Sequence, residues 1–153
     1  MQPKSRKRKQ RAVVDTNVVV AGISGFRDQY VAGRVPSADL MFRWADEEHF
    51  IWLYTENILT EYKEILKRLH VRPAMIGAFI NLIRERGEAV EVRAEAEISP
   101  DPKDDPFCAC SEAGTADVIF TLNPKDFPQS RLNAKVLAPN VAKTQRRRLT
   151  DSR

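Results

Sequence analysis

The stretch "RAVVDTNVVVAG", residues 11–22, decides the fold of this chain. Three apolar residues lead into Asp15, Thr16 and Asn17, and the chain then becomes apolar again. A buried carboxylate without a partner is very costly, so Asp15 should be paired, capped or bound to a metal ion. Because Asp15 follows a short apolar strand, we expect it at the carboxyl edge of a sheet, where it can point into a crevice.

Strands and helices alternate along the rest of the chain. Short β-branched, aromatic or alternating runs predict strands, and apolar residues at helical spacing predict helices. A turn into a short apolar segment and a loop at 27–37 are expected after the first strand. The predicted strands cover residues 12–14, 50–55, 89–94, 117–122 and 134–139, and the predicted helices cover residues 38–48, 58–69, 73–86 and 106–113. This alternation predicts an α/β sandwich with a mainly parallel sheet.

Length and charge indicate one domain with two basic ends. The 153 residues suffice for one core, and no apolar run approaches the roughly 20 residues that span a membrane. Residues 1–11 hold six Lys and Arg and residues 143–153 hold five, so residues 12–142 carry 14 basic and 20 acidic residues. We expect a cytoplasmic protein without a membrane partner. Its predicted parts are a basic disordered tail at 1–10, a domain at 11–142 and a second basic disordered tail at 143–153. The tails either attract RNA or only solubilise the chain.

Further acids lie near the ends of other predicted elements. Helix 58–69 carries an apolar stripe that consists of Ile58, Tyr62, Ile65 and Leu69. Glu61 borders this stripe, so its carboxylate can reach over the sheet edge. Asp104 and Asp105 precede helix 106–113, and Asp126 follows strand 117–122. Carboxylates that converge on one crevice repel each other unless a divalent cation lies among them, and hard oxygen ligands favour Mg²⁺ or Mn²⁺.

Each acid also has a structural interpretation. Asp105 before Pro106 suits a helix N-cap, and Glu61 alone suits a solvated helix surface. Asp15 has no comparable structural reason to follow a strand. No Gly-rich phosphate loop is present, so binding of a nucleoside triphosphate is not expected.

Three segments of the chain resemble the PIN-domain family in order and spacing. They are "VVDTNVVVAG", "ENILTEYKEIL" and "DPKDDPFCACSEAGTADVIFTLNPKDFP". The resemblance runs from about residue 11 to 139 and is nearest to the bacterial VapC-type toxin branch. It implies a three-layer α/β/α fold and a metal-dependent endoribonuclease that cleaves single-stranded or loop RNA. It also implies RNA and an antitoxin protein as partners, and it leaves a homodimer open.

The acidic site of the family carries over residue by residue. Its first two acids match Asp15 and Glu61. The third matches Asp104, with Asp105, one residue closer to the helix, as the second choice. Thr16 and Asn17 would orient Asp15 or a bound water.

The fourth acid of the family falls where this chain departs from the pattern. Many relatives have an Asp at the place of Asn123, so we expect Asp126 to supply the charge and Asn123 a weaker contact. Asp117 opens the same strand and should lie about 13 Å away, four residues at about 3.3 Å each. The predicted catalytic residues are Asp15, Glu61, Asp104 and Asp126, and the predicted ligands of Mg²⁺ or Mn²⁺ are Asp15, Asp104 and Asp126.

Three functions compete on these residues. The first is a metal-dependent endoribonuclease that serves as the toxin of a toxin–antitoxin pair. The second is a PIN-like module that binds RNA or protein without cleavage, which the neutral Asn123 favours. The third is a metal-dependent phosphatase, which needs an acid two residues after its nucleophilic Asp. Asn17 occupies that position, so the phosphatase ranks last.

Overall fold

The computed structural model describes residues 8–27, 29–92 and 105–139. Its centre is a five-stranded sheet of order β3-β2-β1-β4-β5, in which every recorded strand pair is parallel. The strands are β1 (Gln10–Val14), β2 (Phe50–Tyr54), β3 (Glu88–Ala89), β4 (Val118–Phe120) and β5 (Lys135–Leu137). The helices are α1 (Thr16–Arg27), α2 (Pro36–Glu47), α3 (Glu56–Arg68), α4 (Pro73–Arg86) and α5 (Asp105–Ala113), with 3₁₀ turns η1 (Pro124–Asp126) and η2 (Gln129–Arg131). The predicted α/β/α sandwich with a parallel sheet is confirmed.

Strand β1 is the middle strand of the sheet. Ala12 pairs with Trp52 of β2 on one side and with Val118 of β4 on the other. Ala12, Val13 and Val14 are fully buried, as expected for a strand that is covered on both faces and therefore apolar throughout.

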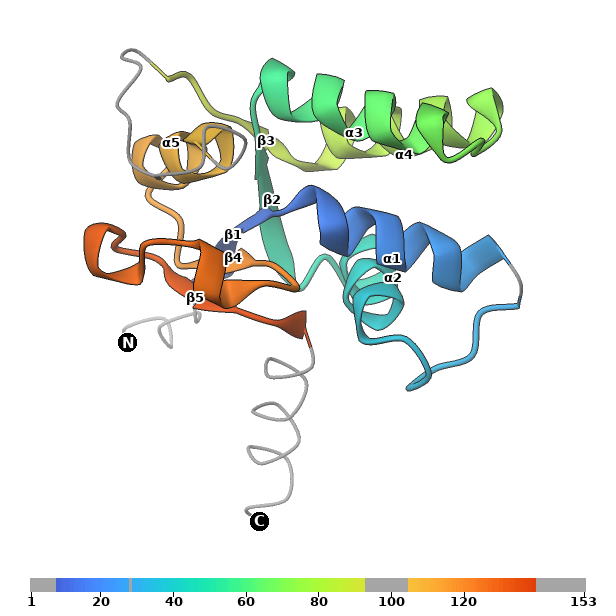
Figure 1. The fold of residues 1–153 in the computed structure, drawn as a ribbon, viewed down its shortest axis with the longest axis horizontal. Coiled ribbons are helices and arrows are strands. Elements are labelled where there is room, and N and C mark those ends of the chain that lie inside the picture. Colours follow the sequence, from blue (N-terminus) through green and yellow to red (C-terminus); the bar gives the residue numbers. More distant parts are fainter. Residues whose placement is uncertain (1–7, 28, 93–104, 140–153) are drawn as a thin grey trace, which may run out of the picture.

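The helices cover both faces of this sheet. Figure 1 shows α1 beside α2 and α3 beside α4, with α5 on the opposite side of the sheet from α1 and α2. Helices α1 and α2 approach closely because α1 has Gly22 at their contact, where a Cβ atom would lie 2.1 Å from the sulfur of Met41. Among the described residues, no helix is both long enough and apolar enough to cross a membrane.

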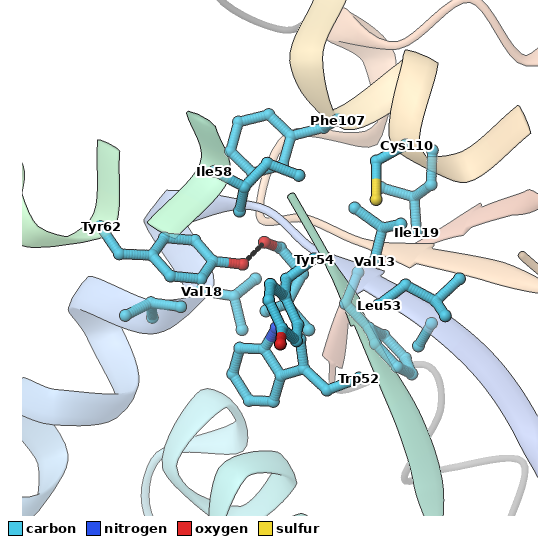
Figure 2. Close-up of a cluster of buried hydrophobic side chains, with 14 of the residues drawn as sticks. Val13, Val18, Trp52, Leu53, Tyr54, Ile58, Tyr62, Phe107, Cys110 and Ile119 are labelled. Atoms are coloured by element: carbon cyan, nitrogen blue, oxygen red, sulfur yellow. Dashed lines mark hydrogen bonds between the residues drawn. The ribbon is translucent and has the colours of Figure 1, made fainter. Parts of the chain in front are cut away.

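One core cluster fixes α3 against the end of β1. Tyr62 of α3 and Phe107 of α5 have ring centroids 6.5 Å apart, and both residues are buried close to Val13 (Figure 2). The Tyr62 hydroxyl donates a hydrogen bond to the backbone carbonyl of Val14, drawn as a dashed line in Figure 2. Since Glu61 precedes Tyr62, this bond places Glu61 beside the residue that follows β1.

The chain order creates a switch point between β1 and β4. From β1 the chain proceeds outward to β2 and β3, and it then returns to β4 on the other side of β1. In open parallel sheets, ligands bind outside the carboxyl ends of the strands at such a point. Asp15 directly follows β1 and Thr121 directly follows β4, so both lie at this edge, as predicted for Asp15.

Two predictions about the elements are wrong in detail. Helix α1 begins at Thr16, immediately after Asp15, where a turn into a short apolar segment was expected. Strand β3 is Glu88–Ala89 and pairs with the last two residues of β2, whereas a strand over 89–94 was expected. Residues 90–92 lie outside any strand, and residues 93–94 lie outside the described residues. Beyond Tyr54, β2 offers no further backbone for β3 to pair with.

Candidate functional site

Asp15 is a buried carboxylate held by two hydrogen-bond donors. The hydroxyl of Thr121 donates to Oδ2 of Asp15 at 2.7 Å, and the backbone N–H of Thr16 donates to Oδ1 at 2.8 Å. The residue is only 8% exposed. Its position at the amino end of α1 favours a negative charge, because the first N–H groups of a helix carry partial positive charge.

The pKa of Asp15 is nevertheless raised above its ordinary value. Burial is the main cause, the hydrogen bonds from Thr121 and Thr16 act in the opposite direction, and the nearby charge of Asp126 adds to the rise. Both hydrogen-bond donors of Asp15 are neutral, and it forms no ion pair with any residue that the structure describes. A buried carboxylate in this state is stabilised by a cation that enters the site.

Thr121 is a site residue that the sequence analysis missed. Besides donating to Asp15, its hydroxyl oxygen accepts a hydrogen bond from the backbone N–H of Asn123 at 3.1 Å and lies 3.4 Å from Nδ2 of Asn17. The side chain is fully buried. A hydroxyl directly after the apolar run "VIF" was a usable signal, since the same reasoning singled out Asp15 after "AVV".

Thr16 and Asn17 connect Asp15 to the surrounding segments. The Thr16 hydroxyl donates a hydrogen bond to the carboxylate of Glu61 and so links α1 to α3. The side-chain carbonyl of Asn17 accepts from the backbone N–H of Leu122 at 3.1 Å. Asn17 therefore fixes the segment after β4 and reaches Asp15 only through Thr121.

These residues line a cavity of about 720 Å³ at the carboxyl edge of the sheet, which we call the acidic groove. Its carboxylates come from Asp15, Glu61, Glu64 and Asp126. Asp126 is exposed in η1, and Asn123 lines the groove beside it. Glu64 was not predicted from the sequence.

Beyond Glu64, the wall of the acidic groove consists of apolar residues and one basic residue. Ile65 of α3 and Leu69, the residue after α3, belong to the predicted apolar stripe, and both line the groove, with Leu69 44% exposed. The core therefore covers only part of the apolar face of α3. Arg68, one turn beyond Glu64, places a guanidinium at the same wall.

Three further acids named in the sequence analysis are Asp117, Asp105 and Asp104. Asp117 is at the amino end of β4, where its carboxylate accepts hydrogen bonds from Nη2 of Arg8 at 2.6 Å and from the backbone N–H of Arg11 at 2.8 Å. Asp117 is therefore at the opposite end of β4 from the groove, which is the reason for which the sequence analysis excluded it from the metal site. Asp105 is the first residue of α5, and Asp104 lies outside the described residues.

The donor set suits a hard divalent cation. The groove offers carboxylate oxygens, which Mg²⁺ and Mn²⁺ prefer. Within residues 8–27, 29–92 and 105–139, no three His, Cys, Asp or Glu side chains are grouped closely enough to hold a metal ion. Asp104, the third metal ligand predicted from the sequence, lies outside these ranges.

Comparisons with known proteins point to one family. The PIN domain family profile matches residues 11–125. Among solved structures, the VapBC2 complex of Rickettsia felis bound to a DNA fragment from its promoter is similar, with a TM-score of 0.54 and 14% identity over 84% of this chain and 98% of that chain. A likeness at this identity shows the fold. No curated protein matches the chain.

Proposed function

Because this chain belongs to the PIN domain family, we propose that it is a metal-dependent endoribonuclease that cleaves single-stranded or loop RNA. The observation that carries the proposal is Asp15, a buried carboxylate at the switch point that lines the same groove as Asp126 and has only neutral donors. A buried acid of this kind is costly to the fold, so a functional role in binding a cation accounts for it better than a structural role.

The residues of the acidic groove would share the work. Asp15 and Asp126, with Asp104, would hold Mg²⁺ or Mn²⁺. When bound, the ion supplies an activated water and neutralises charge on the phosphate. Thr121 fixes the orientation of the Asp15 carboxylate. Glu61, fixed by Thr16, is the carboxylate that we assign to accept a proton from a water in the groove.

RNA is the proposed substrate because the groove is open and has a basic residue, Arg68, in its far wall. Arg68 forms no ion pair with any described residue, so its guanidinium is available to a phosphate of the strand. We further propose that the basic segments 1–10 and 143–153, on either side of the predicted domain at 11–142 in the sequence, attract the RNA backbone by their positive charge.

We also propose that the nuclease is the toxin of a toxin–antitoxin pair. Support comes from the similar fold of the VapBC2 complex. An antitoxin could inhibit by placing a Lys or Arg side chain among the groove carboxylates where the metal would bind. Strong expression should then slow cell growth and a co-expressed antitoxin should restore it. Normal growth with abundant folded protein would remove the toxin role but leave the nuclease role intact.

A non-catalytic RNA- or protein-binding module is the second candidate. Asn123 favours it, because a neutral amide stands where many relatives have an acid. The two candidates separate when purified protein is incubated with single-stranded RNA and Mn²⁺ or Mg²⁺, with EDTA as the control. We expect cleavage with either metal and none with EDTA. Binding of RNA without cleavage under all conditions would establish the second candidate.

A further inference from the structure

A second cavity adjoins the acidic groove. It has a volume of about 320 Å³, lies between α1 and the segment 29–35 that leads into α2, and falls within the size range of small-ligand sites. Ala21 of α1 lines both cavities. Val20 and Ala21 line the groove and Ala21, Ser24 and Gly25 line the second cavity, so the two cavities follow one another along α1.

The segment 29–35 is held in place by a buried acid. Asp39, 6% exposed in the first turn of α2, accepts a hydrogen bond from the Tyr30 hydroxyl at 2.7 Å and from the backbone N–H of Gly33 at 3.0 Å. Gly33 has a φ of 87°, a backbone conformation that suits glycine. The wall of the cavity is thus an ordered structure.

Aromatic contacts also hold Tyr30 in this wall. Tyr30 lies between Phe26 and Phe42, with ring centroids 5.1 Å and 4.9 Å away. Burial and the bond to Asp39 raise the pKa of Tyr30 to about 12, so the phenol keeps its proton and its bond to Asp39 at neutral pH.

The lining of the second cavity has the opposite charge from the acidic groove. Arg34 is the basic residue of the lining, Ser24 and Gln29 are neutral polar residues, and the described lining contains no acidic residue. Gly25, Val31 and Val35 add small or apolar surface. An anionic group joined to a flat, partly apolar group matches this lining, and a nucleotide has both parts.

From this geometry we propose that the second cavity is a subsite for a nucleotide of the RNA strand next to the one that is cleaved. Arg34 contacts the phosphate of that nucleotide, and its base lies against Gly25 and Val31. The inference rests on the proposed function, because the acidic groove supplies the cleavage site and the second cavity positions the strand.

The first test measures binding without cleavage. Uridine or adenosine monophosphate is titrated into the full chain in EDTA while the backbone amide signals are followed by NMR. We expect saturable shifts at Ser24, Gly25 and Arg34, and their loss in Arg34→Gln. Shifts confined to the acidic groove would overturn the subsite.

The second test separates substrate binding from chemistry. Arg34→Gln should raise the KM for single-stranded RNA about tenfold, as expected for the loss of one charge-assisted hydrogen bond, and leave kcat within about twofold. Ser24→Phe, which fills the cavity from an exposed position, should act in the same direction. The control Arg72→Gln removes an exposed arginine that does not line either cavity.

The outcomes distinguish the two proposals. If wild-type protein fails to cleave RNA, the nuclease proposal is wrong, and the NMR titration alone decides whether the second cavity binds a nucleotide. If cleavage occurs and Arg34→Gln leaves KM unchanged, the subsite is wrong. If Ser24→Phe leaves KM unchanged but prevents an antitoxin from restoring growth, the cavity binds protein and the nucleotide assignment is overturned.

Discussion

The hydroxyl of Thr121 donates a hydrogen bond of 2.7 Å to Oδ2 of Asp15, which joins the carboxyl ends of β4 and β1. The two residues are 106 positions apart in the chain, yet each directly follows a buried strand of the same sheet. This bond sets the orientation of the carboxylate on which the proposed site depends.

Replacement of the Thr121 hydroxyl should weaken metal binding while the fold survives. In Thr121→Val the shape is nearly kept, but Asp15 loses a donor and the Asn123 amide loses an acceptor. We expect the Mn²⁺ concentration at half-maximal cleavage to rise about 10- to 100-fold, as for other partners that orient metal ligands.

The matched control is Thr121→Ser, which retains the hydroxyl. It should stay within a few-fold of wild type in the same metal titration. An equal loss in Thr121→Ser and Thr121→Val would show that the effect comes from core packing.

Asp15→Asn should raise the stability of the metal-free protein at neutral pH. The raised pKa of Asp15 means that the folded state disfavours its ionised form. The destabilisation therefore develops as the pH rises from the ordinary value of 3.8 through the folded-state pKa, and it disappears below 3.8, where Asp15 is protonated in both states. Thermal unfolding in EDTA at pH 7 and at low pH measures this difference.

Added Mn²⁺ provides the control for this stability change. It should raise the Tm of wild type, because an ion that binds only the folded state stabilises it, and should raise that of Asp15→Asn much less. A Tm for Asp15→Asn below that of wild type in EDTA at pH 7 would contradict the assignment of Asp15 as a destabilising, functional acid.

The fourth acid can be located by three single substitutions. Asp126→Asn should increase the metal required for cleavage about tenfold or more, because the groove loses one of its charges, and Asn123→Asp should decrease it. Asp117→Asn should leave the metal requirement unchanged, since Asp117 accepts hydrogen bonds from the Arg8 side chain and the Arg11 backbone at the other end of β4. Metal titrations of the cleavage rate compare all three. If only Asp117→Asn raises the metal requirement, the metal site lies at the amino end of β4 and the proposed location is wrong.

Much of the architecture was predictable because local patterns and the sheet agree. The apolar run before Asp15 became the central strand, and the amphipathic pattern of 58–69 became α3 with Tyr62 buried. Position after a buried strand was enough to place Asp15 at the ligand-binding edge.

The remaining details depend on tertiary contacts that periodicity does not record. Residues 89–94 alternate like a strand, but pairing stops where β2 ends at Tyr54. Ile65 and Leu69 share the apolar face of α3, yet the core covers only part of that face and leaves them in the acidic groove. Thr121 escaped notice because a threonine in a strand is ordinarily explained by β-propensity.

The most direct test of the central claim is the initial rate of RNA cleavage over a range of Mn²⁺ concentrations for wild type, Asp15→Asn and Asp46→Asn. Asp46 is an exposed acid on α2 outside both cavities, so its substitution removes one carboxylate without touching the groove. We predict that Asp15→Asn lowers the rate at least about a hundredfold, beyond the loss caused by an orienting partner, while Asp46→Asn matches wild type. Equal, metal-dependent rates for Asp15→Asn and wild type would contradict the claim that Asp15 holds the catalytic metal.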